Sequence, residues 1–195
     1  MPSTAAVAAE LETVRGEIRS LASRLRLENL TREGAVGRWS VKDVIAHFAE
    51  WDRWNLAQYR AAFQGGAPYY DGRRPEYPPE FERVMPADQR NEMIYQAARR
   101  RCVEEVLQDF DAVVDGFLAW LRGRPDRDMA AELGLDFDDR DGSGRMFRLV
   151  SDMPQVSRPL SLADLLLGDD PDASVGGHWR QHLPELREFV TRQSS

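Results

Sequence analysis

The stretch "GRWSVKDVIAHFAEWDRW", residues 37–54, contains the start of a helix and one of the three histidines of the chain. Ser40 is a good N-cap, and Asp43, three residues later, completes a capping box. Trp39 and Val44 stand at the two positions of a hydrophobic staple around this cap. These four residues therefore predict where the helix begins, and they leave the histidine inside it to be explained.

Apolar residues with helical spacing indicate four main helices. The helix described above is expected to run over residues 41–63 and to end at Gly65. Similar stripes predict helices over residues 7–25, 88–122 and 170–192. Four long amphipathic helices are typical of an all-α fold, and we predict a four-helix bundle.

Two long connections join these helices. Residues 65–87 are rich in proline and glycine, which predicts a long loop that is either a lid or rim beside a site or a plain surface connection. Between the last two long helices, "RMFRLV" predicts a short strand, in a hairpin closed by "DGSG", and we expect any strand to lie within residues 123–158. A short helix is expected over residues 161–167, and residues 1–195 are expected to form a single domain.

Composition limits the classes of function. The net charge of −7 argues against binding to a nucleic-acid backbone, which requires a surplus of Lys and Arg. No apolar run has the length of a membrane span, and the N-terminal residues lack the pattern of a signal peptide, so we expect a cytoplasmic protein. The single Cys102 has apolar neighbours, which favours a packed core thiol over a reactive one.

The other two histidines, His178 and His182, are four residues apart on the last predicted helix. This spacing places both imidazoles on one helical face, where their nitrogens can reach one metal ion. His47, from another helix, can complete a set of three nitrogens that leaves one coordination position open. The alternative from the residues alone is that the histidines are hydrogen-bonded, half-buried residues of an ordinary bundle.

Two motifs resemble a known family. "GRWSVKDVIAHFAEW" is similar to the second-helix signature of the DinB-like superfamily, and "GGHWRQHLPELREF" is similar to its last-helix His-x-x-x-His motif. The Leu-Pro-Glu after the second late histidine resembles the ClbS/DfsB branch of that superfamily. The resemblance covers roughly residues 5–65, 88–122 and 160–192.

This resemblance implies a four-helix bundle, dimeric in many members, with a divalent ion such as Zn or Ni on His47, His178 and His182. It also implies a small-molecule site near His47, with Trp51 as a wall of the pocket. Asn91 and Tyr95 are candidate substrate contacts, although helix-start polarity and core packing explain these two residues equally well. Members of the ClbS/DfsB branch do not all bind a metal, so a site without metal stays an open alternative.

Two classes of function are consistent with the resemblance. The first is a metal-dependent transferase or hydrolase that acts on a small electrophilic molecule, with or without a low-molecular-weight thiol, in detoxification or self-resistance. The second is a non-catalytic bundle of the stress-response type that binds a ligand or a metal. The sequence places no general base by motif, and it does not decide between the two classes.

Overall fold

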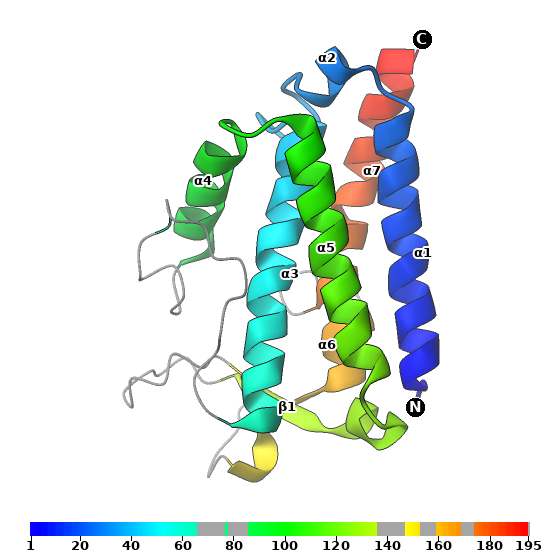
Figure 1. Ribbon diagram of the computed structural model, residues 1–195, viewed down its shortest axis with the longest axis vertical. Coiled ribbons are helices and arrows are strands. Elements are labelled where there is room, and N and C mark those ends of the chain that lie inside the picture. Colours follow the sequence, from blue (N-terminus) through cyan, green and yellow to red (C-terminus); the bar gives the residue numbers. More distant parts are fainter. Residues whose placement is uncertain (66–76, 78–85, 136–146, 153–158, 169–173, 195) are drawn as a thin grey trace.

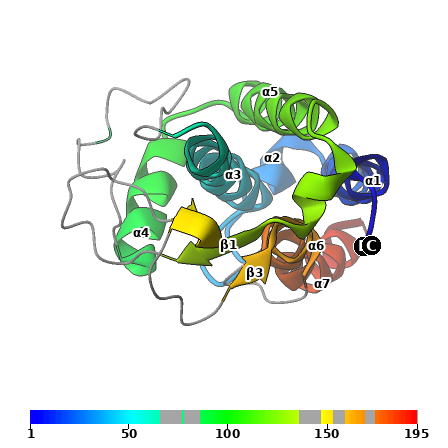
Figure 2. The same cartoon turned by 90° about the horizontal axis from the view of Figure 1, so that it is seen from below.

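A computed structural model describes residues 1–65, 77, 86–135, 147–152, 159–168 and 174–194. Figure 1 shows a bundle in which two long helices run in one direction and two in the opposite direction. Viewed along the bundle in Figure 2, α3 lies beside α5, and α1 lies beside α7. The four long helices are α1 (Thr4–Ser23), α3 (Val41–Gln64), α5 (Val103–Arg122) and α7 (Val175–Ser194). The predicted all-α four-helix bundle is confirmed.

The capping box predicted for α3 is present. The Ser40 Oγ accepts a hydrogen bond from the Asp43 amide at 3.2 Å, and the Asp43 Oδ2 accepts one from the Ser40 amide at 3.0 Å. The helix ends at Gln64, and Gly65 follows with a φ of 76°, which a residue without a Cβ adopts at little cost. The short helix α2 (Leu27–Leu30) connects α1 to this segment.

The single helix predicted over residues 88–122 is wrong, because the chain forms two helices there, α4 (Ala87–Ala98) and α5. Cys102 caps the start of α5: its Sγ accepts from the Glu105 amide at 3.4 Å, while the Glu105 Oε2 accepts from the Cys102 amide at 3.0 Å. The Lys42 Nζ donates to the carbonyls of Ala98 and Arg101, at 2.9 and 3.0 Å, and so satisfies backbone acceptors where α4 ends.

The cap also corrects the expectation for the thiol. Cys102 is exposed, so it is not a packed core residue. The apolar stripe continues across the junction between α4 and α5, with Ala98 and Val106 both buried. Because the stripe is continuous, apolar spacing alone does not reveal this junction in the sequence. An N-cap position requires a residue outside the helix whose side chain bonds back to the first turn, and that requirement overrides apolar spacing here.

A small antiparallel sheet, in the order β2-β1-β3, lies at the lower end of the bundle in Figure 1. The central strand β1 (Glu132–Leu135) pairs with β2 (Phe147–Leu149), which confirms the strand predicted in "RMFRLV". The "DGSG" turn lies outside the described residues. The strand β3 (Leu160–Ser161) corrects the expectation that strands stop at residue 158, because the extended backbone that leads into the N-cap of the next helix pairs with β1. Two short 3-10 helices, η2 (Asp126–Ala130) and η3 (Val150–Asp152), flank the sheet.

The predicted short helix is confirmed as α6 (Leu162–Leu167). The long helix α7 begins at Val175 rather than near residue 170, because the Ser174 Oγ accepts from the Gly177 amide at 2.8 Å and so caps the helix. A Cβ on Gly176 would lie 2.8 Å from the Leu166 carbonyl oxygen. Glycine at this position therefore lets the end of α6 approach the start of α7 closely.

Most of the proline- and glycine-rich connection over residues 65–87, including the predicted lid or rim, lies outside the described residues. Tyr77 is described, is only 4% exposed, and packs against Ile94 and Ala97 of α4. Among the described residues, no helix combines the length and the apolar character that crossing a bilayer requires.

Candidate metal centre

His47 lies on α3, in the second turn after the capping box, and its side chain is buried with 4% exposure. The Trp39 ring, from the residue before the N-cap, contacts the His47 ring edge-on with a centroid distance of 4.8 Å. The capping box fixes the residue at which α3 begins, and it thereby also fixes the position of His47 along the helix.

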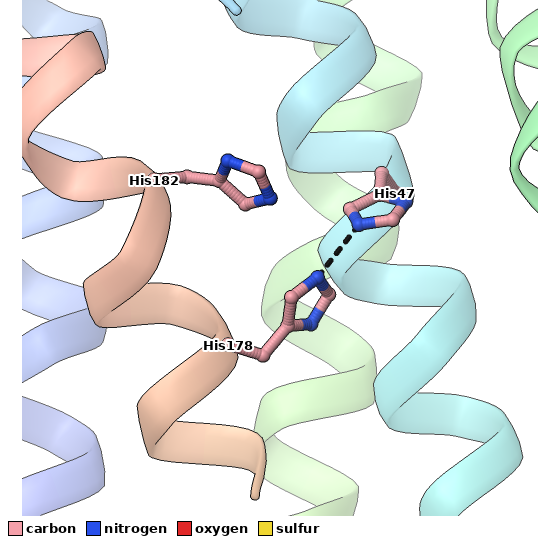
Figure 3. A group of neighbouring side chains, drawn as sticks. All are labelled: His47, His178 and His182. Atoms are coloured by element: carbon pink, nitrogen blue, oxygen red, sulfur yellow. Dashed lines mark hydrogen bonds between the residues drawn. The ribbon is translucent and has the colours of Figure 1, made fainter. Parts of the chain in front are cut away.

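His178 and His182 lie one turn apart on α7, with ring centroids 5.5 Å apart. Figure 3 shows both side chains extending from α7 toward His47 on α3. The ring centroid of His47 lies 4.6 Å from that of His178 and 5.8 Å from that of His182. The convergence predicted for the three histidines is present in the structure.

The nitrogen positions suit one metal ion. The Nε2 atoms of His47 and His178 are 2.7 Å apart, and one nitrogen from each of the three rings lies within 4.8 Å of the others. Around a tetrahedral metal with bonds of about 2.0–2.1 Å, two ligand nitrogens are roughly 3.3 Å apart. The observed separations lie on both sides of this value, so the spacing of the three nitrogens is close to that of a ligand set around one ion.

The protonation states also suit a metal ligand set, since only neutral imidazole binds a metal ion. Burial holds the pKa of His47 well below its usual 6.5, and the nearby His178 and His182 lower it further. Burial, together with the neighbouring His182, lowers the pKa of His178 to about 3. Part of the His178 surface reaches solvent, but its ring packs against Phe48 and Trp51, at centroid distances of 5.5 and 6.4 Å.

The short contact between the two Nε2 atoms requires a shared proton in the metal-free protein, because two imidazole lone pairs repel each other at 2.7 Å. The other ring nitrogen of His47, Nδ1, is buried and has no hydrogen-bond partner among the described residues. A buried polar atom without a partner costs about 1–3 kcal/mol. A metal ion could take the place of the shared proton between the two Nε2 atoms, and the donor set therefore fits a metal.

His182 differs from His47 in the partner of its second nitrogen. Its Nδ1 lies 3.3 Å from the Glu185 Oε2, which leaves Nε2 free to face the other two histidines. Within the described residues, the group contains no fourth histidine, cysteine or carboxylate. A metal held by these three imidazoles would keep an open coordination position, as catalytic zinc sites do.

Aromatic side chains line the space around the histidines. Trp51 is partly exposed, and its ring centroid lies 6.3 Å from that of His47. Phe48 also packs against the histidines, and its ring centroid lies 5.8 Å from that of His182. The sequence motifs place Trp39 only in the hydrophobic staple and indicate no role for Phe48 or Glu185. The only signal in the sequence was the short distance of Trp39 and Phe48 from His47, and of Glu185 from His182. Ordinary core residues and surface carboxylates occur at the same spacings, so this signal was not specific.

Asn91 and Tyr95, the two predicted substrate contacts, differ in how close they lie to the histidines. The Asn91 Oδ1 accepts a hydrogen bond from the Trp51 Nε1 at 2.8 Å, and this contact points the NH₂ of the amide away from the indole. Tyr95 is buried, stacks on Trp39 at 6.1 Å, and accepts a hydrogen bond from Arg99 at its hydroxyl. Trp39 therefore separates Tyr95 from His47, whereas Trp51 brings Asn91 next to the triad. A role of any of the three in substrate binding stays a prediction.

A family model described as the DinB superfamily matches residues 10–149. The chain belongs to the DinB superfamily. The matched segment contains α3 with His47 and ends at β2, before the helix that carries the other two histidines. The superfamily accounts for the bundle, and the convergence of the α7 histidines on α3 is a separate observation of this structure.

Two solved structures have a similar fold. A protein from Streptococcus pneumoniae has a TM-score of 0.65 and 7% sequence identity, over 98% of this chain and 92% of that one. An uncharacterised protein from Escherichia coli UTI89 has a TM-score of 0.63 and 9% identity, over 98% of this chain and 95% of that one. At these identities the likeness shows the fold alone. No curated protein sequence matches the chain.

Proposed function

We propose that His47, His178 and His182 bind one divalent metal ion, with zinc or nickel as the expected occupant. The observation that carries this proposal is that one nitrogen from each of three imidazoles, on two helices, lies within 4.8 Å of the others. Imidazole nitrogen suits both metals, and both bind nitrogen sites more tightly than Mn²⁺ or Fe²⁺. The shared proton between His47 and His178 is the group that the metal would displace.

We further propose that the protein is a transferase or hydrolase that acts on a small electrophilic molecule. When bound, a divalent ion in an open three-histidine site supplies Lewis acidity that activates water or a thiol near neutral pH. The residues around it are suited to hold an apolar substrate with one polar group. Trp51 offers an aromatic face beside the histidines, and the Asn91 amide offers donors to an oxygen of the substrate.

Tyr95 contributes to this site through its contact with Trp39. Its ring stacks on Trp39, which in turn contacts His47, so Tyr95 holds Trp39 in place beside the histidine. The Leu-Pro-Glu after His182 resembles the ClbS/DfsB branch, which supports a role in detoxification or self-resistance. A low-molecular-weight thiol as co-substrate is consistent with the same resemblance.

The test uses zinc-loaded and nickel-loaded protein with two electrophiles. With monochlorobimane and cysteine, transfer forms a C–S bond and releases chloride and a proton. With styrene oxide, hydrolysis adds water to give a diol. We expect metal-dependent turnover of at least one probe above the rate of the free metal ion.

Two variants and one alternative outcome complete this test. His178→Gln should abolish the turnover, and Glu12→Gln, on the exposed surface of α1, should leave it unchanged. Metal uptake without turnover of either probe would instead favour the non-catalytic binding bundle. The absence of both uptake and turnover would overturn the proposal.

A further inference from the structure

Asp52 is a carboxyl group completely enclosed in the bundle. It lies on α3, its exposure is 0%, and its Oδ2 accepts a hydrogen bond from the Trp179 Nε1 at 3.0 Å. Trp179 is itself 2% exposed and lies on α7, directly after His178. The other carboxyl oxygen, Oδ1, is buried and has no hydrogen-bond partner among the described residues.

Such a group is costly for stability. Enclosing a carboxyl group with one oxygen unsatisfied destabilises the folded state, and an apolar residue at this position would not leave that oxygen unsatisfied. Burial accordingly raises the pKa of Asp52 well above its usual value, because the charged carboxylate is disfavoured in this enclosed position. Stability alone therefore does not account for a carboxyl group at this position.

The position of the bond suggests what the group does. In the described part of the chain, two side-chain hydrogen bonds join α3 to α7: the contact between His47 and His178, and the bond between Asp52 and Trp179. A metal ion bound by the histidines would replace the first bond. The second would then remain as the polar link that sets the spacing and register of the two helices that carry the ligands.

Aromatic packing transmits this link to the histidines. The Trp179 ring packs on Phe48 at 6.4 Å and on Phe110 at 5.9 Å, and Phe48 in turn contacts the rings of His178 and His182. Trp179 cannot rotate freely while its indole N–H is bonded to Asp52. His178, its neighbour on the helix, is thereby held facing α3.

We infer that Asp52 is a positioning residue for the metal centre, which acts through its hydrogen bond to Trp179 to align His178 with His47. This inference rests on the proposed metal site. It predicts that loss of the bond weakens metal binding without a matching loss of stability. A residue that served the fold alone would change the two quantities together.

The experiment compares Asp52→Leu, Asp52→Asn and Trp179→Phe with the parent protein. Zinc affinity is measured by competition with a chromophoric chelator, cobalt uptake by visible absorption, and stability by urea unfolding of the metal-free proteins. Asp52→Leu and Trp179→Phe should each lower the zinc affinity several-fold, up to about the tenfold that loss of a direct hydrogen-bond partner of a ligating histidine causes. Both should also alter the cobalt spectrum.

The remaining arms separate positioning from folding. Asp52→Asn keeps an oxygen acceptor for the indole and should retain most of the affinity. Asp52→Leu leaves the Trp179 N–H without this acceptor, so the variant that replaces both partners, Asp52→Leu with Trp179→Phe, is the one that should be at least as stable as the parent. The double variant Asp52→Leu with Trp179→Phe should bind no more weakly than either single variant, because both remove the same bond. If Asp52→Leu does not fold, Trp179→Phe carries the comparison.

Two results would overturn the inference in distinguishable ways. Zinc affinity and cobalt spectra equal to the parent in both Asp52→Leu and Trp179→Phe would overturn it and leave the metal site standing. A parent protein that takes up neither zinc nor cobalt would overturn the proposed function and this inference together.

Discussion

The bundle has two unlike seams, one between α1 and α5 and one between α3 and α7. Between α1 and α5 the buried residues are apolar, such as Leu11 and Leu118, and ion pairs such as Arg122 with Glu12 lie on the surface. Between α3 and α7 lie His47, His178 and the carboxyl group of Asp52. The first seam stabilises the fold by apolar burial. The second encloses polar groups whose burial lowers the stability of the fold, and a metal ion bound to the histidines would offset part of that loss.

The largest expected effect on stability comes from the apolar seam. Leu11 is 1% exposed, and Leu11→Ala should lower the free energy of unfolding by about 2–5 kcal/mol through lost burial and a cavity. Urea unfolding measures the loss. The zinc affinity of the folded variant should match that of the parent, since Leu11 lies on α1 and the histidines lie on α3 and α7. A zinc affinity that falls with stability would show that the seams are not independent.

The polar seam should make the metal-free protein sensitive to acid. The pKa values of His47 and His178 are lowered in the folded state, so the unfolded chain binds protons below about pH 6.5 that the folded chain does not. Stability should therefore fall as pH drops from 6.5 toward the folded pKa, which is about 3 for His178. Each histidine contributes a slope of up to about 1.4 kcal/mol per pH unit.

The matched control for this prediction is His178→Gln, measured by urea unfolding with a chelator present. Asp52 acts in the opposite direction, because its raised pKa makes the folded state lose stability as pH rises above 3.8. This contribution is common to the parent and the variant, so it cancels in their difference. The variant should have the shallower dependence below pH 6.5, and equal slopes would contradict the burial of a neutral His178.

A smaller effect is expected at the rim of the polar seam. Glu185 is about half exposed, and its carboxylate lies 3.3 Å from the Nδ1 of His182. Glu185→Gln keeps an oxygen acceptor but removes the charge, and Glu185→Ala removes both. We expect zinc affinity to fall by up to about tenfold in Glu185→Ala and by less in Glu185→Gln, because the partner of a ligating histidine orients it. The reverse order would contradict an orienting role.

Much of the fold was predictable from local rules. Ser40 and Asp43 marked the start of α3 because a capping box uses neighbouring residues only. The break before α5 was missed because Cys102 is rarely recognised as a cap and the apolar stripe crosses it in phase. The pairing of β3 with β1 depends on contacts distant in sequence, which spacing alone does not show.

The candidate site was likewise predictable only in part. The spacing of His178 and His182 predicted a shared helical face, and the resemblance added His47. The bond between Asp52 and Trp179 was not predictable, because it depends on the rotation of α3 against α7 and not on any local pattern. The separation of Tyr95 from the histidines by Trp39 depends likewise on tertiary packing.

The most direct test of the central claim is the metal content of protein purified without an affinity tag, loaded with zinc and passed through a desalting column. The parent should retain one zinc ion per chain by elemental analysis. His47→Ala, His178→Ala and His182→Ala should each lose most of it, since two imidazoles bind a divalent ion far more weakly than three. Zinc contents that are equal in the parent and all three variants would contradict a metal centre built from these histidines.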